Sequence, residues 1–208
     1  MIFSSKLIEN AVEQFSKLPG IGRKTALRMV LHLLKTEKEK VTAFIDAISK
    51  MSSEIVFCKK CHNVSDGVLC SICANTARQQ QQLCVVENLR DVIAIESTQQ
   101  YNGLYHILGG VLSPLDGVGP DQLNMATLLK RVETDAVEEI IMALSPNIEG
   151  DTTVYYIAKQ LQNHPVKITT IARGIAFGGE LEYADEMTLA RSIAKRLPVE
   201  NYVSVSTK

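Results

Sequence analysis

Four cysteines in two closely spaced pairs constrain the fold of this chain more than any other feature. The segment CKKCHNVSDGVLCSIC, at residues 58–73, contains Cys58 with Cys61 and Cys70 with Cys73. A gap of two residues lets both thiolates of one pair face the same ion, and two pairs supply the four sulfurs of a closed tetrahedral site. Between the pairs, Asp66 and Gly67 favour a turn that returns the second pair to the first. The spacing predicts one structural Zn²⁺ per chain.

Two alternatives to four thiolate ligands remain open at this point. The cysteines could form disulfides, although their paired spacing is typical of metal sites and the N-terminal sequence MIFSSK lacks the pattern of a secretory signal. His62 could replace one ligand, but four cysteines already complete the coordination, so we expect His62 in a solvated loop. With reduced cysteines and no apolar run of membrane-spanning length, we expect the chain in the cytoplasm.

Basic residues gather in the first third of the 208-residue chain. Residues 1–78 contain 12 Lys and Arg against 7 Asp and Glu, a net charge of +5. Residues 79–208 contain 10 against 16, a net charge of -6, so the total of -1 conceals the difference. We therefore expect any contact with a polyanion in the N-terminal part.

Three helices are predicted before the cysteines, over residues 4–16, 23–35 and 37–54, because apolar residues recur there at helical spacing. In the third helix, the residues expected to face inward are Val41, Phe44, Ile45 and Ile48.

A short glycine-containing turn, LPGIG at residues 18–22, joins the first two helices. Gly20 and Gly22 permit backbone conformations that other residues avoid, and they lead into the start of the second helix. Free amides there, together with the positive end of the helix dipole, can bind a phosphate. Lys24 and Arg28 share one helix face, and Arg23 lies beside them. The alternative is a plain helical hairpin with solvated basic residues.

After a polar stretch at residues 74–82, short strands and helices alternate. Strands are predicted at 83–86, 103–108, 139–144 and 166–171, and helices at 91–96, 121–132, 152–162 and 186–196. This alternation is typical of a parallel sheet with helices on both faces. The tail at 202–206, YVSVS, has a strand-like pattern that could pair with a neighbouring subunit.

The turn and its flanks resemble the helix-hairpin-helix motif of DNA-binding proteins. The fixed points of that motif are supplied by Phe15, Leu18, Pro19, Gly20, Ile21, Gly22 and Ala26. The resemblance implies contacts to DNA phosphates with little readout of base sequence. The residues expected to make these contacts are Lys24, Arg28, Arg23, Gly20 and Gly22.

The second half resembles the Toprim fold of topoisomerases, primases and some nucleases. Catalytic Toprim proteins bind Mg²⁺ through a Glu after the first strand and an Asp-x-Asp pair after the third. Glu87 matches the Glu, but Ser145 and Asn147 occupy the Asp positions and are neutral. We therefore expect weak or no Mg²⁺ binding and no catalysis. The alternative is an Mg²⁺-dependent nucleic-acid enzyme that uses Glu87, Glu149 and Asp151.

The order of these parts, followed by YADEMTLAR at residues 183–191, resembles the bacterial RecR family of recombination-repair proteins over nearly the whole chain. The resemblance implies a non-enzymatic DNA-binding clamp or adaptor. By this resemblance, the protein would form a tetrameric homo-oligomeric ring and act with RecO and RecF to promote loading of RecA on gapped DNA. Glu87, Glu149 and Asp151 are the residues expected to meet a partner such as RecO.

The predicted fold is an α+β chain of several modules. They are a helix-hairpin-helix region at 1–54, a four-cysteine zinc finger at 55–76, an α/β Toprim domain with a mostly parallel sheet at 79–175, and a C-terminal helix and strand for oligomerisation at 176–208.

Overall fold

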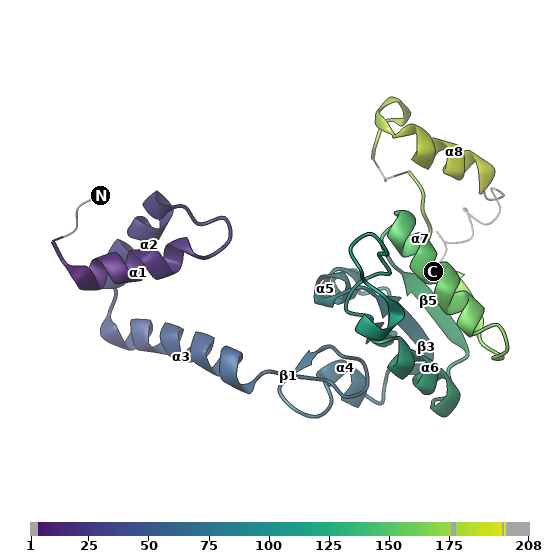
Figure 1. The fold of residues 1–208 in the computed structure, drawn as a ribbon, viewed down its shortest axis with the longest axis horizontal. Helices are drawn as coiled ribbons and strands as arrows, with labels where there is room; N and C mark the ends of the chain where they lie inside the picture. The colour runs from purple at the N-terminus through teal and green to yellow at the C-terminus, as the bar shows by residue number, and fades with distance from the viewer. Residues whose placement is uncertain (1–3, 176–177, 197, 199–208) are drawn as a thin grey trace. The chain divides into compact units, whose positions relative to one another are not determined.

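The computed structural model describes residues 4–175, 178–196 and 198, and the chain divides into two compact units, 1–55 and 56–208. The first unit contains α1 (Lys6–Ser16), α2 (Arg23–Lys35) and α3 (Lys38–Glu54) (Figure 1). α1 and α2 pack against each other around Val12, Ala26 and Val30, which are buried. The three predicted helices are therefore confirmed, with small shifts at their ends.

The apolar face of α3 is left uncovered. No residue of α3 is buried, and Phe44, Ile45 and Ile48 are 44%, 57% and 47% exposed. The prediction that these three side chains face inward is wrong, and of the four only Val41 is partly buried. Helical periodicity indicates that one face is apolar but not what covers it, because a face that meets a second chain has the same pattern.

The second unit begins with a small module that we call the zinc knuckle, residues 56–74. Its elements are β1 (Val56–Phe57), β2 (Val64–Ser65) and α4 (Ser71–Ala74), and the two strands pair antiparallel. The knuckle leads into the sheet through residues 75–78, which contain no helix or strand.

A four-stranded sheet forms the centre of the second unit. Its strands are β3 (Gln79–Val86), β4 (Gly103–Ile107), β5 (Glu139–Ala143) and β6 (Lys167–Thr170), in the spatial order β4-β3-β5-β6. Every pairing is parallel, which confirms the predicted architecture. β3 begins before the predicted Leu83, because the glutamines at 79–82 include residues that pair through the backbone although most of their side chains are exposed.

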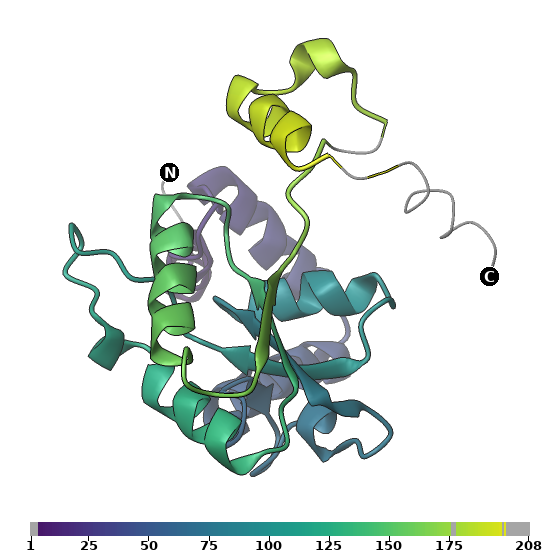
Figure 2. The ribbon, with the colours of Figure 1, turned by 90° about the vertical axis from the view of Figure 1, so that its right-hand side faces the viewer.

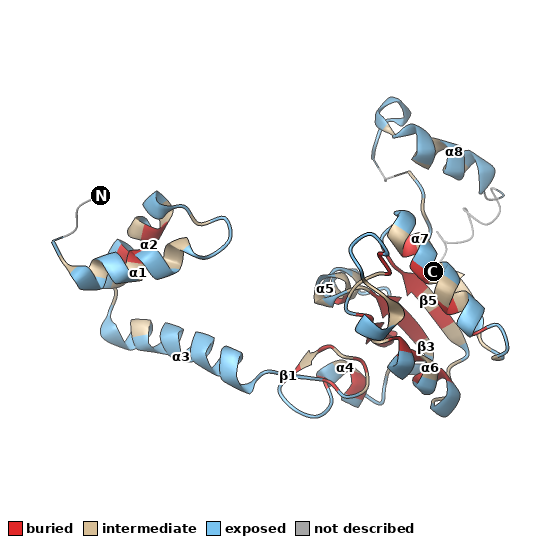
Figure 3. Cartoon of the chain, in the orientation of Figure 1, coloured by how far each residue is buried: buried red, intermediate tan, exposed pale blue. Residues whose placement is uncertain are grey.

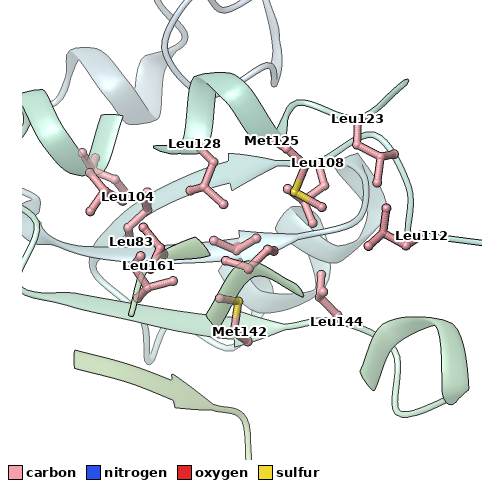
Figure 4. Close-up of a cluster of buried hydrophobic side chains, with 14 residues drawn as sticks. Leu83, Leu104, Leu108, Leu112, Leu123, Met125, Leu128, Met142, Leu144 and Leu161 are labelled. Carbon is pink, nitrogen blue, oxygen red and sulfur yellow. The ribbon is translucent and has the colours of Figure 1, made fainter. Parts of the chain in front are cut away.

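Helices cover both faces of this sheet (Figure 2). They are α5 (Leu89–Ser97), α6 (Met125–Thr134) and α7 (Ile148–Gln160). Leu83 packs on the side of α6 and α7, in a cluster that includes Leu128 (Figure 4). Cys84 and Val86 point to the opposite face and pack with Val92 of α5. Buried residues accordingly follow the strands (Figure 3), as expected for a parallel sheet with two covered faces.

Helix ends differ from the predictions where side chains outside the apolar pattern decide them. α7 starts at Ile148 and not at Thr152, because the Asn147 side chain caps it by accepting a hydrogen bond from Gly150 N at 2.7 Å. The predicted first turn of α6 is instead a separate 3-10 turn, η1 (Pro120–Gln122).

The chain continues from β6 into η2 (Leu181–Tyr183) and α8 (Glu186–Ala194). Asp185 caps α8, since its carboxylate accepts a hydrogen bond from Thr188 N at 2.9 Å. The strand-like pattern at 202–206 lies outside the described residues. In the ranges that the structure describes, no helix combines the length and the apolar character needed to cross a membrane.

We expect Gly150→Ala to destabilise the protein by about 2 kcal/mol, because an added methyl group must displace the turn between β5 and α7. A Cβ atom at this position would lie 2.0 Å from Ser145 O and 3.0 Å from Asn147 Oδ1. The control is Gly119→Ala, where a Cβ atom meets nothing within 4 Å. Denaturant unfolding of both variants tests this. Equal free energies of unfolding for the two variants would show that the turn accommodates the methyl group without cost.

Candidate metal centre and nucleic-acid interface

The four cysteines of the zinc knuckle converge on one point. Their Sγ atoms all lie within 4.8 Å of one another and all four residues are buried. In a tetrahedral site with Zn–S bonds of about 2.3 Å, neighbouring sulfurs are about 3.8 Å apart, so the cluster fits a zinc ion. The Sγ atoms of Cys61 and Cys70 are 3.5 Å apart and every cysteine is a free thiol, so the disulfide alternative is wrong. The predicted structural zinc site is confirmed.

Short-range hydrogen bonds hold the two cysteine pairs in place. Cys58 N donates to Asn63 O at 2.7 Å, and His62 N donates to Cys58 O at 2.9 Å, which folds the first pair into a tight turn. In the second pair, Cys70 lies at the N-terminus of α4, and its sulfur accepts a hydrogen bond from Cys73 N at 3.5 Å. Between the pairs, Lys59 N donates to Val68 O at 3.1 Å and Gly67 N to Ser65 Oγ at 3.2 Å, which forms the return turn that Asp66 and Gly67 predict.

The four thiols do not share one environment. The pKa of the Cys73 thiol is lowered to about 6, first by a hydrogen bond with Cys61, against the effect of burial, and then by the positive charge of Arg131. Burial raises the pKa of the Cys70 thiol. The pKa of Cys61 is also raised, first by its hydrogen bond with Cys73 and then by burial. Such a cluster needs a cation before all four sulfurs can be thiolates.

The zinc knuckle is bound to the parallel sheet and to α6. Ile107 N at the end of β4 donates to Cys61 O at 2.9 Å. His62 Nε2 lies 2.8 Å from Thr127 Oγ1 on α6, and its ring meets the ring of His106 edge-on at 5.3 Å. The expectation of a solvated loop for His62 is wrong, because the sheet supplies partners that lie far away in the sequence.

The turn between α1 and α2 has the geometry that its glycines suggest. Gly20 has a φ of +78°, in the left-handed region that favours glycine. Gly22 is the N-cap of α2, and the first bond of the helix runs from Ala26 N to Gly22 O at 2.9 Å. The backbone amides before Ala26 therefore have no hydrogen-bond acceptor within the helix, and no acidic residue occupies the first turn of α2.

The three predicted basic residues lie at the start of α2 and are exposed. Lys24 and Arg28 line one shallow hollow on the surface of α2, which also includes His32 and Lys35. Among the residues that the structure describes, Arg23, Lys24 and Arg28 form no ion pair, so their charges are available to a ligand.

The three predicted acidic residues lie near the carboxyl edge of the sheet without forming one cluster. In the described part of the chain, the only group of three or more potential metal ligands is the cysteine cluster. Glu87 Oε1 accepts a hydrogen bond from Ser145 N at 2.6 Å, which connects the ends of β3 and β5. Asp151 pairs with Arg173 and lies 3.7 Å from Arg191, while Glu149 is partly exposed.

Arg173 and Arg191 were not singled out by the sequence analysis. They belong to the segment after β6, and they reach Asp151 only because that segment returns toward the N-terminus of α7. Together with Leu144, Ile148 and Met187, they line a hollow at this end of the sheet. For Arg191 the signal in the sequence is its place at the end of YADEMTLAR, a segment that contributes to the family resemblance, whereas Arg173 is a single arginine in a mixed stretch.

We expect Cys70→Ser to lose zinc and to unfold at a clearly lower temperature, because a serine hydroxyl does not replace a thiolate ligand. Zinc content and thermal unfolding measure both effects. Cys84→Ser is the control, since Cys84 is buried in β3 outside the metal cluster and its loss should leave the zinc content unchanged. Full thermal stability of a zinc-free Cys70→Ser protein would contradict a structural role for the metal.

His106 should make the stability of the protein fall at acid pH. Its pKa is lowered from 6.5 to about 3, mainly by burial and to a smaller extent by Arg131 and His62, against a hydrogen bond to Asn124 O that raises it. Between these values the unfolded chain binds a proton that the folded chain does not, so the free energy of unfolding decreases by about 1.4 kcal/mol per pH unit as pH falls. In His106→Gln the slope of the free energy of unfolding against pH should be smaller by about 1.4 kcal/mol per pH unit between pH 6.5 and 5. Equal slopes would mean that His106 is protonated in the folded state.

Four families of known protein domains match the chain in succession. They are the RecR helix-hairpin-helix at residues 8–52, the RecR four-cysteine zinc finger domain at 55–75, the Toprim domain at 81–172 and the RecR C-terminal region at 174–196.

Relatives resemble the chain over almost its full length. Recombination protein RecR of Amoebophilus asiaticus is 56% identical over 197 residues, which cover 95% of this chain and 98% of the relative. The protein of the same name from Flavobacterium johnsoniae is 57% identical over 200 residues, covering 96% and 97%. That from Porphyromonas gingivalis is 51% identical over 194 residues, covering 93% and 94%. The chain therefore belongs to the RecR family of recombination proteins.

Proposed function

We propose that this protein is a non-enzymatic DNA-binding adaptor in recombinational DNA repair. The observation that carries the proposal is the start of α2, where Lys24 and Arg28 are exposed and unpaired within the described residues, beside a helix N-terminus that is open to an anion. Membership of the RecR family supports the role in recombination.

Contacts at this surface would read phosphates and not bases. The available groups are backbone amides after Gly22 and the long cationic side chains of Lys24, Arg28 and Arg23, all of which suit a phosphate oxygen. Gly20 contributes by its left-handed backbone, which turns the chain into α2. We therefore expect binding to DNA with little dependence on its sequence.

The absence of catalysis is supported by what the acidic residues do at the edge of the sheet. The Glu87 carboxylate accepts a hydrogen bond from Ser145 N, and the Asp151 carboxylate forms an ion pair with Arg173. Each carboxylate therefore already has a partner within the chain. A hard divalent cation requires several free oxygens at one point, and Ser145 and Asn147 supply no carboxylate. The role of Glu87, Glu149 and Asp151 in meeting a partner such as RecO rests on the family resemblance, and Glu149 is the least engaged of the three.

The proposed assembly is a homotetrameric ring that works in the cytoplasm with RecO and RecF to promote loading of RecA. Within the chain, the exposed apolar face of α3 supports self-association, because Phe44, Ile45 and Ile48 would gain burial against a second copy. The named partners rest on the resemblance to the RecR family.

We expect the double variant Lys24→Ala with Arg28→Ala to bind DNA more weakly, to a similar extent for different sequences. Each lost phosphate contact releases about one counterion fewer, so the slope of log affinity against log salt should decrease by about two. Titrations of a labelled duplex and of a labelled single strand at several salt concentrations measure this.

The matched control is Lys38→Ala with Lys50→Ala, which removes the same charge from exposed positions on α3 in the same unit. It should retain nearly the original slope. If the α2 variant keeps the affinity and slope of the unaltered protein, the start of α2 is not the DNA site.

Incubation with supercoiled plasmid, with and without Mg²⁺, tests the enzymatic alternative. An adaptor should retard the plasmid reversibly, so that protease treatment restores its original mobility. Nicking or relaxation that requires Mg²⁺ and disappears in Glu87→Ala would establish an enzyme and overturn the proposal.

A further inference from the structure

We propose that Arg131 of α6 is an outer-shell partner of the zinc site, whose buried positive charge stabilises the tetrathiolate form of the four cysteines. Nothing in the sequence pattern of the zinc knuckle includes this residue, which lies 58 positions after Cys73.

Arg131 is a buried charge with an incomplete set of partners. Its side chain is only 5% exposed. Nη1 donates to Tyr105 O at 2.6 Å and Nε donates to Asp135 Oδ2 at 3.2 Å. Nη2 is buried and has no hydrogen-bond partner among the residues that the structure describes. A buried donor without a hydrogen-bond partner destabilises the folded protein, so this nitrogen needs an acceptor in the zinc-bound protein.

Three connections hold the surroundings of Arg131 against the zinc knuckle. Thr127, one helical turn earlier on α6, is bonded to His62. Asp135, one turn later, accepts from Arg131 and also from Lys60 Nζ at 3.0 Å, on the same oxygen. Tyr105, which accepts from Nη1, is two residues before Ile107, and Ile107 N is bonded to Cys61 O. The guanidinium therefore lies between α6, β4 and the knuckle.

The positive guanidinium of Arg131 and the negative zinc–thiolate centre are complementary in charge. The centre formed by Zn²⁺ and four thiolates has a net formal charge of about -2. In this chain the four cysteines that supply the thiolates are buried away from water. Thiolate sulfurs bound to zinc accept hydrogen bonds, and partners outside the coordination shell orient the ligands and raise metal affinity. Asp135 neutralises part of the charge of Arg131, but its single shared oxygen is also taken by Lys60, so positive charge remains to act on the sulfurs.

Zinc affinity in Arg131→Gln and Arg131→Lys tests the proposal, with the full-length protein and competition against a chromogenic chelator. Loss of the charge in Arg131→Gln should weaken zinc binding roughly 10- to 100-fold, the usual effect of removing an outer-shell partner. Arg131→Lys retains the charge and should weaken binding less. Lys130→Gln is the control, since the neighbouring Lys130 is exposed and its loss should leave zinc affinity unchanged.

Thermal unfolding of zinc-loaded and zinc-free protein separates this role from simple packing. Arg131→Gln should lower the unfolding temperature of the zinc-loaded protein more than that of the zinc-free protein, in which the buried charge has no thiolate to meet. An equal decrease in both forms, or a zinc affinity within twofold of the unaltered protein, would overturn the proposal.

A second variant keeps the test valid if Arg131→Gln does not fold. Asp135→Asn removes a negative charge that competes for Arg131, so zinc affinity should stay the same or increase although an ion pair is lost. If Asp135→Asn instead weakens zinc binding as strongly as the loss of charge at Arg131 is expected to do, the Arg131–Asp135 pair acts only through local structure and the proposal is wrong.

Discussion

The attachment of the zinc knuckle to the parallel sheet is the interaction on which the second unit depends. The knuckle is too short to bury a core of its own, so it relies on a metal and on a larger surface. The hydrogen bond from Ile107 N to Cys61 O joins the end of β4 to the knuckle, and the contact of His62 with Thr127 joins the knuckle to α6. The metal site and the sheet are therefore expected to lose stability together.

The carboxyl edge of the sheet serves a structural purpose in this chain. Ser145 N donates a hydrogen bond to the Glu87 carboxylate, and the Asn147 side chain caps α7. The three residues that the Toprim resemblance sets at metal-ligand positions therefore hold two loops in place. Asp151 is neutralised by Arg173 and Arg191 of the C-terminal segment. The same edge that binds Mg²⁺ in enzymes thus connects the sheet to the part of the chain that follows it.

Several features follow from local sequence and were predicted correctly. The cysteine spacing predicts the metal cluster because the four ligands lie within one short segment. Gly20 predicts the turn because its left-handed backbone is a property of a single residue. Alternating strands and helices predict the covered parallel sheet. The start of β3 was missed, because exposed glutamines pair through the backbone and produce no apolar pattern.

The sequence by itself determined the order of the modules, the four zinc ligands, the basic hairpin and the neutral residues at Ser145 and Asn147, since each depends on residues close together in the chain. Only the tertiary structure placed His62 against His106, Arg131 beside Lys59 and Lys60 of the knuckle, and Arg173 on Asp151. It also left the apolar face of α3 uncovered. Periodicity records which faces are apolar and which residues are charged, but the partner of each group is decided by packing between segments that lie far apart in the chain.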